Sequence, residues 1–336
     1  MDDQTLFDKI ASSPEPFKTI DELREHLTSA FIENLNATSM EMGRSGDFGK
    51  ALTINDWALR ANEHAGNPLL KAHILFNCGE LALQSDDKEK AEKAYREALD
   101  FYLTRENLVD ILDCTAGLVT VLESRGDSTE IEEVVRRSLA VALGRPGEIP
   151  GEAGRGFMTI GNVLRRQKEQ PLALQCFEAL HELSIQLGDK ELEAEACGQL
   201  GELRAEEEKF EEAKRYYQRA IELDGKNMNL ELKALDLGNL AFVCYRQGNL
   251  EEAANLYKEC LGLRERTGFQ DGADIDLRNA YHVYHYLGKK QEARDLFQRF
   301  NALSADKLSF ASGIEIEAYP LSLDERGRKL SGIRFG

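Results

Sequence analysis

Alanine returns along this chain at a nearly constant interval, with isoleucine at one of the seven positions. The positions are Ala51, Ala91, Ile131, Ala173, Ala213, Ala253 and Ala293, separated by 40, 40, 42, 40, 40 and 40 residues. We call them the marker positions. A period of this length defines one supersecondary unit, which is too small to bury its own apolar face and is stable only when stacked on neighbours. The chain is therefore predicted to be an array of seven repeats.

Further columns of residues recur at helical offsets from the marker positions. Five residues before each marker stands a glycine or a polar residue, namely Gly46, Asp86, Gly126, Lys168, Glu208, Gly248 and Gly288. Residues suited to capping a helix often follow, as at Asp47, Asp87, Asp127 and Asn249. Four residues after the marker the chain carries Asn55, Tyr95, Val135, Phe177, Tyr217, Tyr257 and Phe297, mostly aromatic. Each repeat is thus predicted to be a helix, a short turn and a second helix.

These columns carry a family resemblance. Leu200, Gly201, the segment 210–213, Tyr217 and Ala220 resemble the tetratricopeptide repeat, and the match extends over about residues 32–303. The 40-residue form is similar to the repeats of the LGN/Pins spindle-orientation adaptors, kinesin light chains and bacterial Rap-type regulators. The resemblance implies an all-α, right-handed superhelical solenoid of about seven helix-turn-helix units. It also implies that the first helix of each unit lines a concave surface that binds a peptide. Asn55 and Ile131 depart from the pattern.

Segments outside the regular columns set the expected organisation. We expect an N-terminal extension at residues 1–18, the array at 19–303, and an extended or disordered tail at 304–336. The glycine- and proline-rich segment 144–154 is either a surface loop or a hinge between the third and fourth repeats. The tail alternates apolar residues at 314–323, so it is either mobile, packed on the last repeat, or held in the groove as a pseudo-ligand.

Composition narrows the class of partner. The net charge of −18 disfavours nucleic acid, because binding phosphates requires a clustered positive surface. No stretch of eighteen apolar residues occurs and the first residues are acidic, so membrane insertion and export are not indicated and a cytoplasmic location is expected. The six cysteines are widely spaced on apolar positions and are expected in the core.

The stripe of the first helices opposite the packing columns predicts the binding residues. Guanidinium groups would hold carboxylates, asparagine amides would hold a peptide backbone, and aromatic rings would anchor an apolar side chain. The candidates are Arg155, Asn162, Arg165, Arg166, Asn239, Phe242, Tyr245, Arg246, Arg278, Asn279, His282 and His285. Two alternatives stay open: the arginines lie on a solvated helix face or pair with acids, and the recurring asparagines bond between adjacent repeats.

Catalysis is not expected from this sequence. His282 and His285 stand one turn apart without a third ligand at suitable spacing, so no metal and no cofactor are predicted. We expect a peptide-binding adaptor or assembly scaffold, with self-association through the end repeats left open. The alternative is a Rap-like regulatory switch autoinhibited by the C-terminal tail. An enzyme such as a phosphatase is disfavoured, because no nucleophile and base can be paired.

Overall fold

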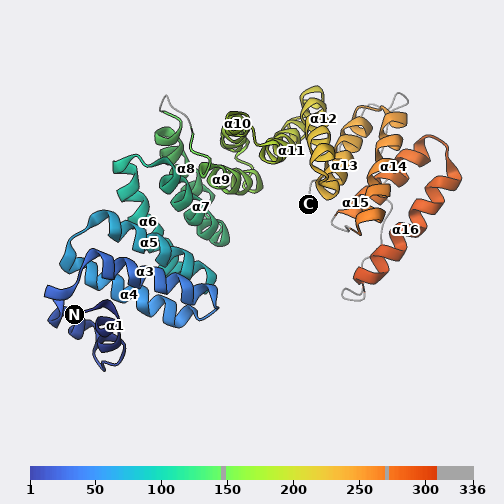
Figure 1. Ribbon diagram of the computed structural model, residues 1–336. Helices are drawn as coiled ribbons and strands as arrows, with labels where there is room; N and C mark the ends of the chain where they lie inside the picture. Colours follow the sequence, from blue (N-terminus) through green and yellow to red (C-terminus); the bar gives the residue numbers. More distant parts are fainter. Residues whose placement is uncertain (145–148, 269–271, 309–336) are drawn as a thin grey trace. The chain divides into compact units, whose positions relative to one another are not determined.

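The computed structural model describes residues 1–144, 149–268 and 272–308, and these residues form helices joined by short turns (Figure 1). Fourteen of the helices make the seven predicted hairpins. The pairs are α3 (Ser29–Arg44) with α4 (Phe48–Ala65), α5 (Pro68–Gln84) with α6 (Lys88–Arg105), α7 (Leu108–Arg125) with α8 (Ser128–Ala142), α9 (Ala153–Arg166) with α10 (Gln170–Leu187), α11 (Lys190–Glu206) with α12 (Phe210–Asn227), α13 (Leu230–Arg246) with α14 (Leu250–Thr267), and α15 (Ala273–Tyr286) with α16 (Lys290–Leu308). The all-α repeat architecture is confirmed.

The turn inside every hairpin uses the left-handed backbone region. The seven residues five places before the markers all have positive φ, including the non-glycine residues Asp86 (62°), Lys168 (65°) and Glu208 (60°). Asp47, Asp87 and Asp127 then accept a backbone N–H bond at the start of the second helix, as predicted. Asn249 makes no such side-chain bond.

The marker positions lie in the core. All seven residues at these positions are at most 3% exposed, because the second helix of each hairpin packs there on the first. Glycine on the first helix admits the aromatic ring that follows the marker. A Cβ on Gly161 would lie 2.6 Å from the ring of Phe177, and one on Gly201 would lie 2.9 Å from Tyr217. The close approach requires glycine at these places.

The N-terminal residues form a cap on the first hairpin. Helices α1 (Asp3–Ala11) and α2 (Pro16–Glu22) and the 3₁₀ helix η1 (Arg24–His26) precede α3, and Leu6, Ile10 and Ile20 are buried. The ring of Phe7 meets Trp57 of α4 edge-on at 6.2 Å. The boundary predicted between the N-terminal extension and the array, at residues 18 and 19, falls inside α2. The first hairpin starts ten residues later, at Ser29.

The residues that depart from the repeat pattern are also accommodated in the core. Asn55 is buried, and its Nδ2 donates to the carbonyl oxygen of Ile74 at 3.2 Å, at a place where five of the other repeats have an aromatic ring. Ile131 is fully buried like the alanines it replaces. All six cysteines are free and buried, as the sequence predicts.

The chain divides into two compact units, residues 1–179 and 180–336. The division falls within α10, after Ala179, and not at the segment 144–154, where a hinge was one of the two expectations. Residues 145–148 of that segment and residues 309–336 of the predicted tail lie outside the described residues. Unit 1 holds the cap and α3–α9, and unit 2 holds α11–α16, each with its own buried core.

Candidate peptide-binding surfaces

Two of the predicted arginines of unit 1 pair with acids of the preceding repeat. Arg166 of α9 donates from Nε to Glu123 Oε1 at 2.7 Å and from Nη2 to Glu123 Oε2 at 2.8 Å. Arg155 Nη2 lies 3.1 Å from Asp113 Oδ2, also on α7. The forked bonds from Arg166 lower the pKa of Glu123. These arginines therefore join α7 to α9, and their charge is already neutralised.

The asparagines divide between roles. Asn77 Nδ2 donates to Asn36 Oδ1 at 3.0 Å, so this pair bonds between adjacent repeats, one of the two alternatives that the sequence left open. Asn162, Arg165 and Asn239 are half-buried. Asn279 is only 6% exposed and lies beside the Tyr257 hydroxyl, which places it in the packing between helices.

Arg246 of unit 2 is held by its neighbours. Its Nη2 lies 2.8 Å from Glu208 Oε1, and its guanidinium carbon stands 5.5 Å from the ring centroid of Phe210 and 5.8 Å from that of Phe242. Phe242 keeps a half-exposed ring, whereas Tyr245 is 2% exposed and packs in the core, with its ring stacked near Tyr286 at 6.4 Å. Arg246 and Phe242 thus form a rigid cationic and aromatic edge on α13.

Helix α15 carries a different group of side chains. Arg278 and His285 are exposed and His282 is half-buried. Burial lowers the pKa of His282, and the nearby Arg278 and His285 lower it further. Its imidazole is therefore neutral at physiological pH. Among the residues described by the structure no group of three His, Cys, Asp or Glu side chains is placed to hold a metal ion.

Two exposed aliphatic residues belong to the same face. Leu235 of α13 is 40% exposed and Ile275 of α15 is 50% exposed, and they occupy the same place in consecutive repeats. Residues 235, 239, 242 and 246 share one face of α13, and residues 275, 278, 282 and 285 share one face of α15. We call these eight residues the α13–α15 surface. Ile275 was missed from the sequence, although its 40-residue spacing from Leu235 was a usable signal.

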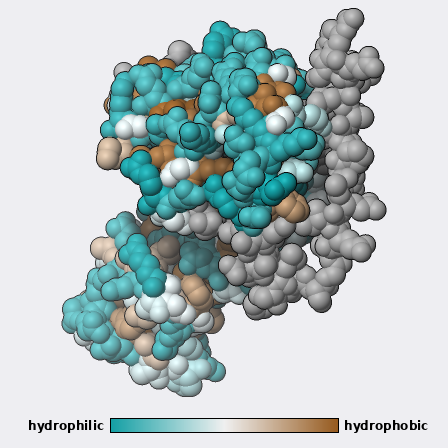
Figure 2. Space-filling view, turned by 90° about the vertical axis from the view of Figure 1, so that its right-hand side faces the viewer, coloured by the Kyte–Doolittle hydropathy of each residue, from teal (hydrophilic) through white to brown (hydrophobic). Residues whose placement is uncertain are grey.

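The predicted site residues fall in both compact units. Arg155, Asn162, Arg165 and Arg166 belong to unit 1, and the other eight belong to unit 2. The α13–α15 surface brings together six of those eight, leaving the buried Tyr245 and Asn279 beneath it. Figure 2 shows one face of the protein, on which apolar patches interrupt a mostly hydrophilic surface.

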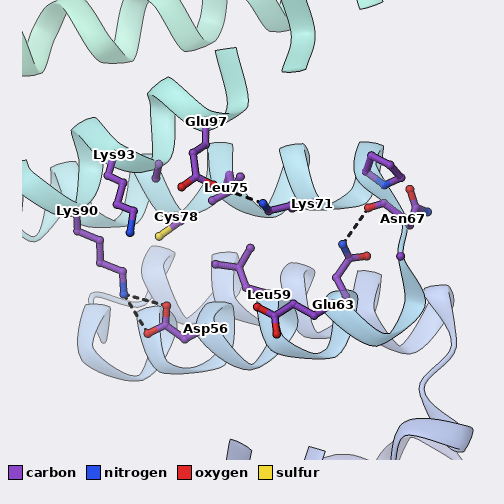
Figure 3. A pocket seen from close by; sticks show the side chains of 14 residues that line it. Asp56, Leu59, Glu63, Asn67, Lys71, Leu75, Cys78, Lys90, Lys93 and Glu97 are labelled. Carbon is purple, nitrogen blue, oxygen red and sulfur yellow. Dashed lines mark hydrogen bonds and ion pairs between the residues drawn. The ribbon is translucent and has the colours of Figure 1, made fainter. Parts of the chain in front are cut away.

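Unit 1 also contains a pocket of about 650 Å³ between α4, α5 and α6 (Figure 3). Its walls carry Lys90, paired with Asp56 at 3.0 Å, and Lys71, paired with Glu97 at 3.5 Å. Its other charged side chains, Lys93 and Glu63, are of opposite sign. The pocket was not predicted, since its lining comes from two repeats and lies away from the first-helix stripe. It has no net charge with which to select a ligand.

Family models described as tetratricopeptide repeat match residues 72–103, 154–226 and 233–300. No curated protein matches the sequence. Among the described residues no helix is long and apolar enough to cross a membrane.

Several solved structures share the fold at low sequence identity. The apo form of RapI is 14% identical, with a TM-score of 0.54, and the match covers 83% of this chain and 98% of that one. A putative kinesin light chain from Podosopora anserina is 15% identical, with a TM-score of 0.50 and coverage of 62% and 98%. The STAND protein PH0952 from Pyrococcus horikoshii, with a tetratricopeptide repeat sensor, is 15% identical, with a TM-score of 0.64 and coverage of 91% and 46%.

The matched models describe a repeat that is typically a non-enzymatic protein-interaction module, and arrays of it serve as scaffolds. Together they span more than half of the sequence. Their residues coincide with the hairpins α5–α6 and α9–α16. The chain belongs to the tetratricopeptide repeat family.

Proposed function

We propose that the α13–α15 surface binds an extended peptide segment of a partner protein, and that the chain acts as an adaptor or assembly scaffold. The observation that carries the proposal is the exposure of Leu235 and Ile275 beside Arg278. Equivalent aliphatic side chains on consecutive repeats form a regular row of apolar contacts, which suits alternate side chains of an extended segment.

The charges around this row indicate the chemistry of the ligand. None of the described residues forms an ion pair with Arg278, in contrast to Arg155, Arg166 and Arg246. A cation that is exposed and not neutralised is available for a carboxylate of a partner. The segment that fits best therefore carries apolar side chains with an Asp or Glu close by, and the half-exposed Asn239 amide is placed to meet its backbone.

Arg246 and Phe242 have a supporting role in this proposal. The guanidinium of Arg246 is already fixed by Glu208 and by two aromatic rings, so it holds the Phe242 ring in place. A ring held in one orientation loses less entropy when a ligand packs on it. Phe242 is thus the anchor, and Arg278 is the residue that recognises charge.

The test is an array of extended peptides that vary in apolar and acidic positions, probed with the full chain. Peptides with an acid next to apolar residues should bind, and Arg278→Glu should weaken that binding more than tenfold, about 1.4 kcal/mol or greater. Arg266→Glu is the matched control, since Arg266 is an exposed arginine on α14 of the same unit. Equal loss in both variants, or no loss in either, contradicts the proposal.

The regulatory alternative rests on the tail. Under that hypothesis, residues 309–336 occupy the groove and partner binding displaces them, as in a Rap-like switch. Deleting residues 309–336 should then raise the affinity for the selected peptide, and unchanged affinity counts against autoinhibition. A cytoplasmic location and self-association through the end repeats stay predictions of the sequence.

A further inference from the structure

Three junctions between consecutive repeats, α6–α7, α12–α13 and α14–α15, contain an equivalent pair of residues. One residue of the pair lies near the end of a second helix, and the other follows twelve residues later on the next first helix. At the junction of α6 and α7 the pair is Tyr102 and Cys114, both buried and uncharged. In two later junctions, α12–α13 and α14–α15, the same place holds acidic or basic side chains.

The junction of α14 and α15 holds a complementary pair. Arg264 donates from Nε to Asp276 Oδ2 at 2.8 Å and its Nη2 lies 2.7 Å from the same oxygen, while Cys260 Sγ donates to it at 3.3 Å. Arg264 is 3% exposed and Asp276 is 7% exposed. A Cβ on Gly238 would lie 2.5 Å from Asp276 Oδ1, so glycine makes room for this carboxylate. The buried acid is matched by a buried cation.

The junction of α12 and α13 repeats this arrangement without the cation. Forty residues earlier, Asp236 takes the place of Asp276, and Gly198 takes the place of Gly238, with a Cβ on Gly198 3.2 Å from Asp236 Oδ1. At the position of Arg264 the chain has Asp224. Asp224 is 1% exposed and Asp236 is 6% exposed. Two buried carboxyl groups therefore occupy the places where the next repeat has an acid and a guanidinium.

The surroundings add acids to this pair. Glu191 and Glu195 of α11 help to raise the pKa of Asp224, and Glu202 of α11 helps to raise the pKa of Asp236. Burial raises the pKa of the Cys197 thiol of α11, and Asp236 is among the nearby charges that raise it further. On α13, Lys233 Nζ lies 3.9 Å from the place that a Cβ on Gly225 would take, and it pairs with Glu259 Oε1 at 3.1 Å.

No partner compensates the two buried acids. Among the described residues none makes an ion pair with Asp224 or Asp236, and both carboxyl oxygens of Asp224 lack a hydrogen-bond partner. Burial and the neighbouring acids raise the pKa of Asp224 to about 6, and they raise that of Asp236 well above its usual range. Asp224 is one of the acids that raise the pKa of Asp236, since two like charges in a buried region cannot both be ionised at low cost.

We propose that the Asp224–Asp236 pair is a proton-binding switch, in which protons held by the two carboxyl groups replace the cation that Arg264 supplies in the next junction. The protonated pair lets α12 and α13 pack closely. Loss of protons leaves buried negative charges without compensation and loosens this junction. The device makes the packing of unit 2 sensitive to pH.

The direction in which pH changes the stability of the fold follows from the raised pKa of the two carboxyl groups. A carboxyl group whose pKa is higher in the folded protein than in the unfolded chain stabilises the fold at low pH. For Asp224 this stabilisation is fully present below its ordinary pKa of 3.8 and is lost as the pH rises through about 6. Unit 2 is thus expected to be more stable to unfolding under mildly acidic conditions than at neutral pH.

The test compares thermal unfolding of the full chain at about pH 5.5 and about pH 7.5. The wild type should unfold at a temperature at least about 2 °C higher at the lower pH. Asp224→Asn and Asp236→Asn should each raise the unfolding temperature at the higher pH. Each should therefore reduce the difference between the unfolding temperatures at the two pH values. Glu222→Gln removes the same charge from the exposed face of α12, where Glu222 pairs with Lys226, and should keep the wild-type difference.

A further variant places a cation at the position equivalent to Arg264. Asp224→Arg recreates the pair of the next junction and should raise the unfolding midpoint at about pH 7.5, with little remaining response to pH. The proposal is overturned if both asparagine variants keep the full wild-type difference, or if Glu222→Gln removes it equally well. A lower midpoint for Asp224→Arg at the higher pH would also overturn it, since the two junctions would then not be equivalent.

Discussion

Gly79 of α5 and Tyr95 of α6 lie so close that a Cβ on Gly79 would stand 2.7 Å from the Tyr95 ring. The hydroxyl of Tyr95 also donates to Glu80 Oε1 at 2.5 Å, which fixes the ring in this position. Neither the ring nor the helix can move aside without loss of packing. The aromatic ring of the repeat therefore packs against the helix only because the facing residue is small.

Gly79→Ala should destabilise the protein by about 1–3 kcal/mol, because the added methyl group overlaps a buried ring. Urea denaturation measures the effect. Gly262 of α14 is the matched control, since nothing lies within 4 Å of a Cβ placed there. Gly262→Ala should stabilise the protein by about 0.5–1 kcal/mol through the greater helix propensity of alanine. Similar effects at the two sites would show that the contact is unimportant.

The left-handed turn residues give a prediction of opposite sign. Lys168 has a φ of 65° between α9 and α10, where glycine has no steric penalty. Lys168→Gly should raise the thermal midpoint, with a net gain of about 0.5–1 kcal/mol after the larger entropy of unfolded glycine is subtracted. Gly248→Ala at the equivalent turn, where φ is 83°, should lower the midpoint. A loss of stability in Lys168→Gly would contradict the assignment.

The N-terminal cap can be followed by fluorescence, because Trp57 is the only tryptophan of the sequence. Trp57 is 8% exposed beneath Phe7, and Ile10 of α1 is fully buried nearby in the same core. Ile10→Asp should release the cap and shift the tryptophan emission to longer wavelength, since a buried unpaired charge is costly. Phe17→Asp alters a residue that is 50% exposed, and its emission should match that of the wild type.

The ion pair of Arg166 and Glu123 makes stability depend on acid. The pKa of Glu123 is lowered in the folded protein, so the pair stabilises unit 1 above the ordinary pKa of 4.5, and its contribution is lost as the pH falls through the folded value. Since both side chains are partly exposed, the effect should stay below about 1 kcal/mol and weaken with salt. Arg166→Met should reduce the acid sensitivity of unfolding, and an unchanged acid profile would exclude this contribution.

The repeat itself could be predicted because its packing is local and periodic. The glycines, the aromatic rings and residues such as Asp86 at the turns recur at fixed offsets, and each offset corresponds to one contact within or between hairpins. The partner of Arg166 could not be predicted, since Glu123 lies 43 residues away and a stripe of one helix does not say which acids face it. The same holds for the burial of Tyr245 and Asn279, which depends on the rotation of α13 and α15.

The proposed binding surface is tested most directly by the affinity of the selected peptide for a chain with Leu235→Ala and Ile275→Ala together. These substitutions remove the aliphatic row without changing charge, and calorimetric titration should show at least a tenfold weaker interaction, about 1.4 kcal/mol or more. Ile185→Ala with Leu187→Ala removes two aliphatic side chains of α10 that are 57% and 51% exposed, and it should leave the affinity within about twofold. Unchanged affinity in the first variant, or an equal loss in the second, would contradict the proposed surface.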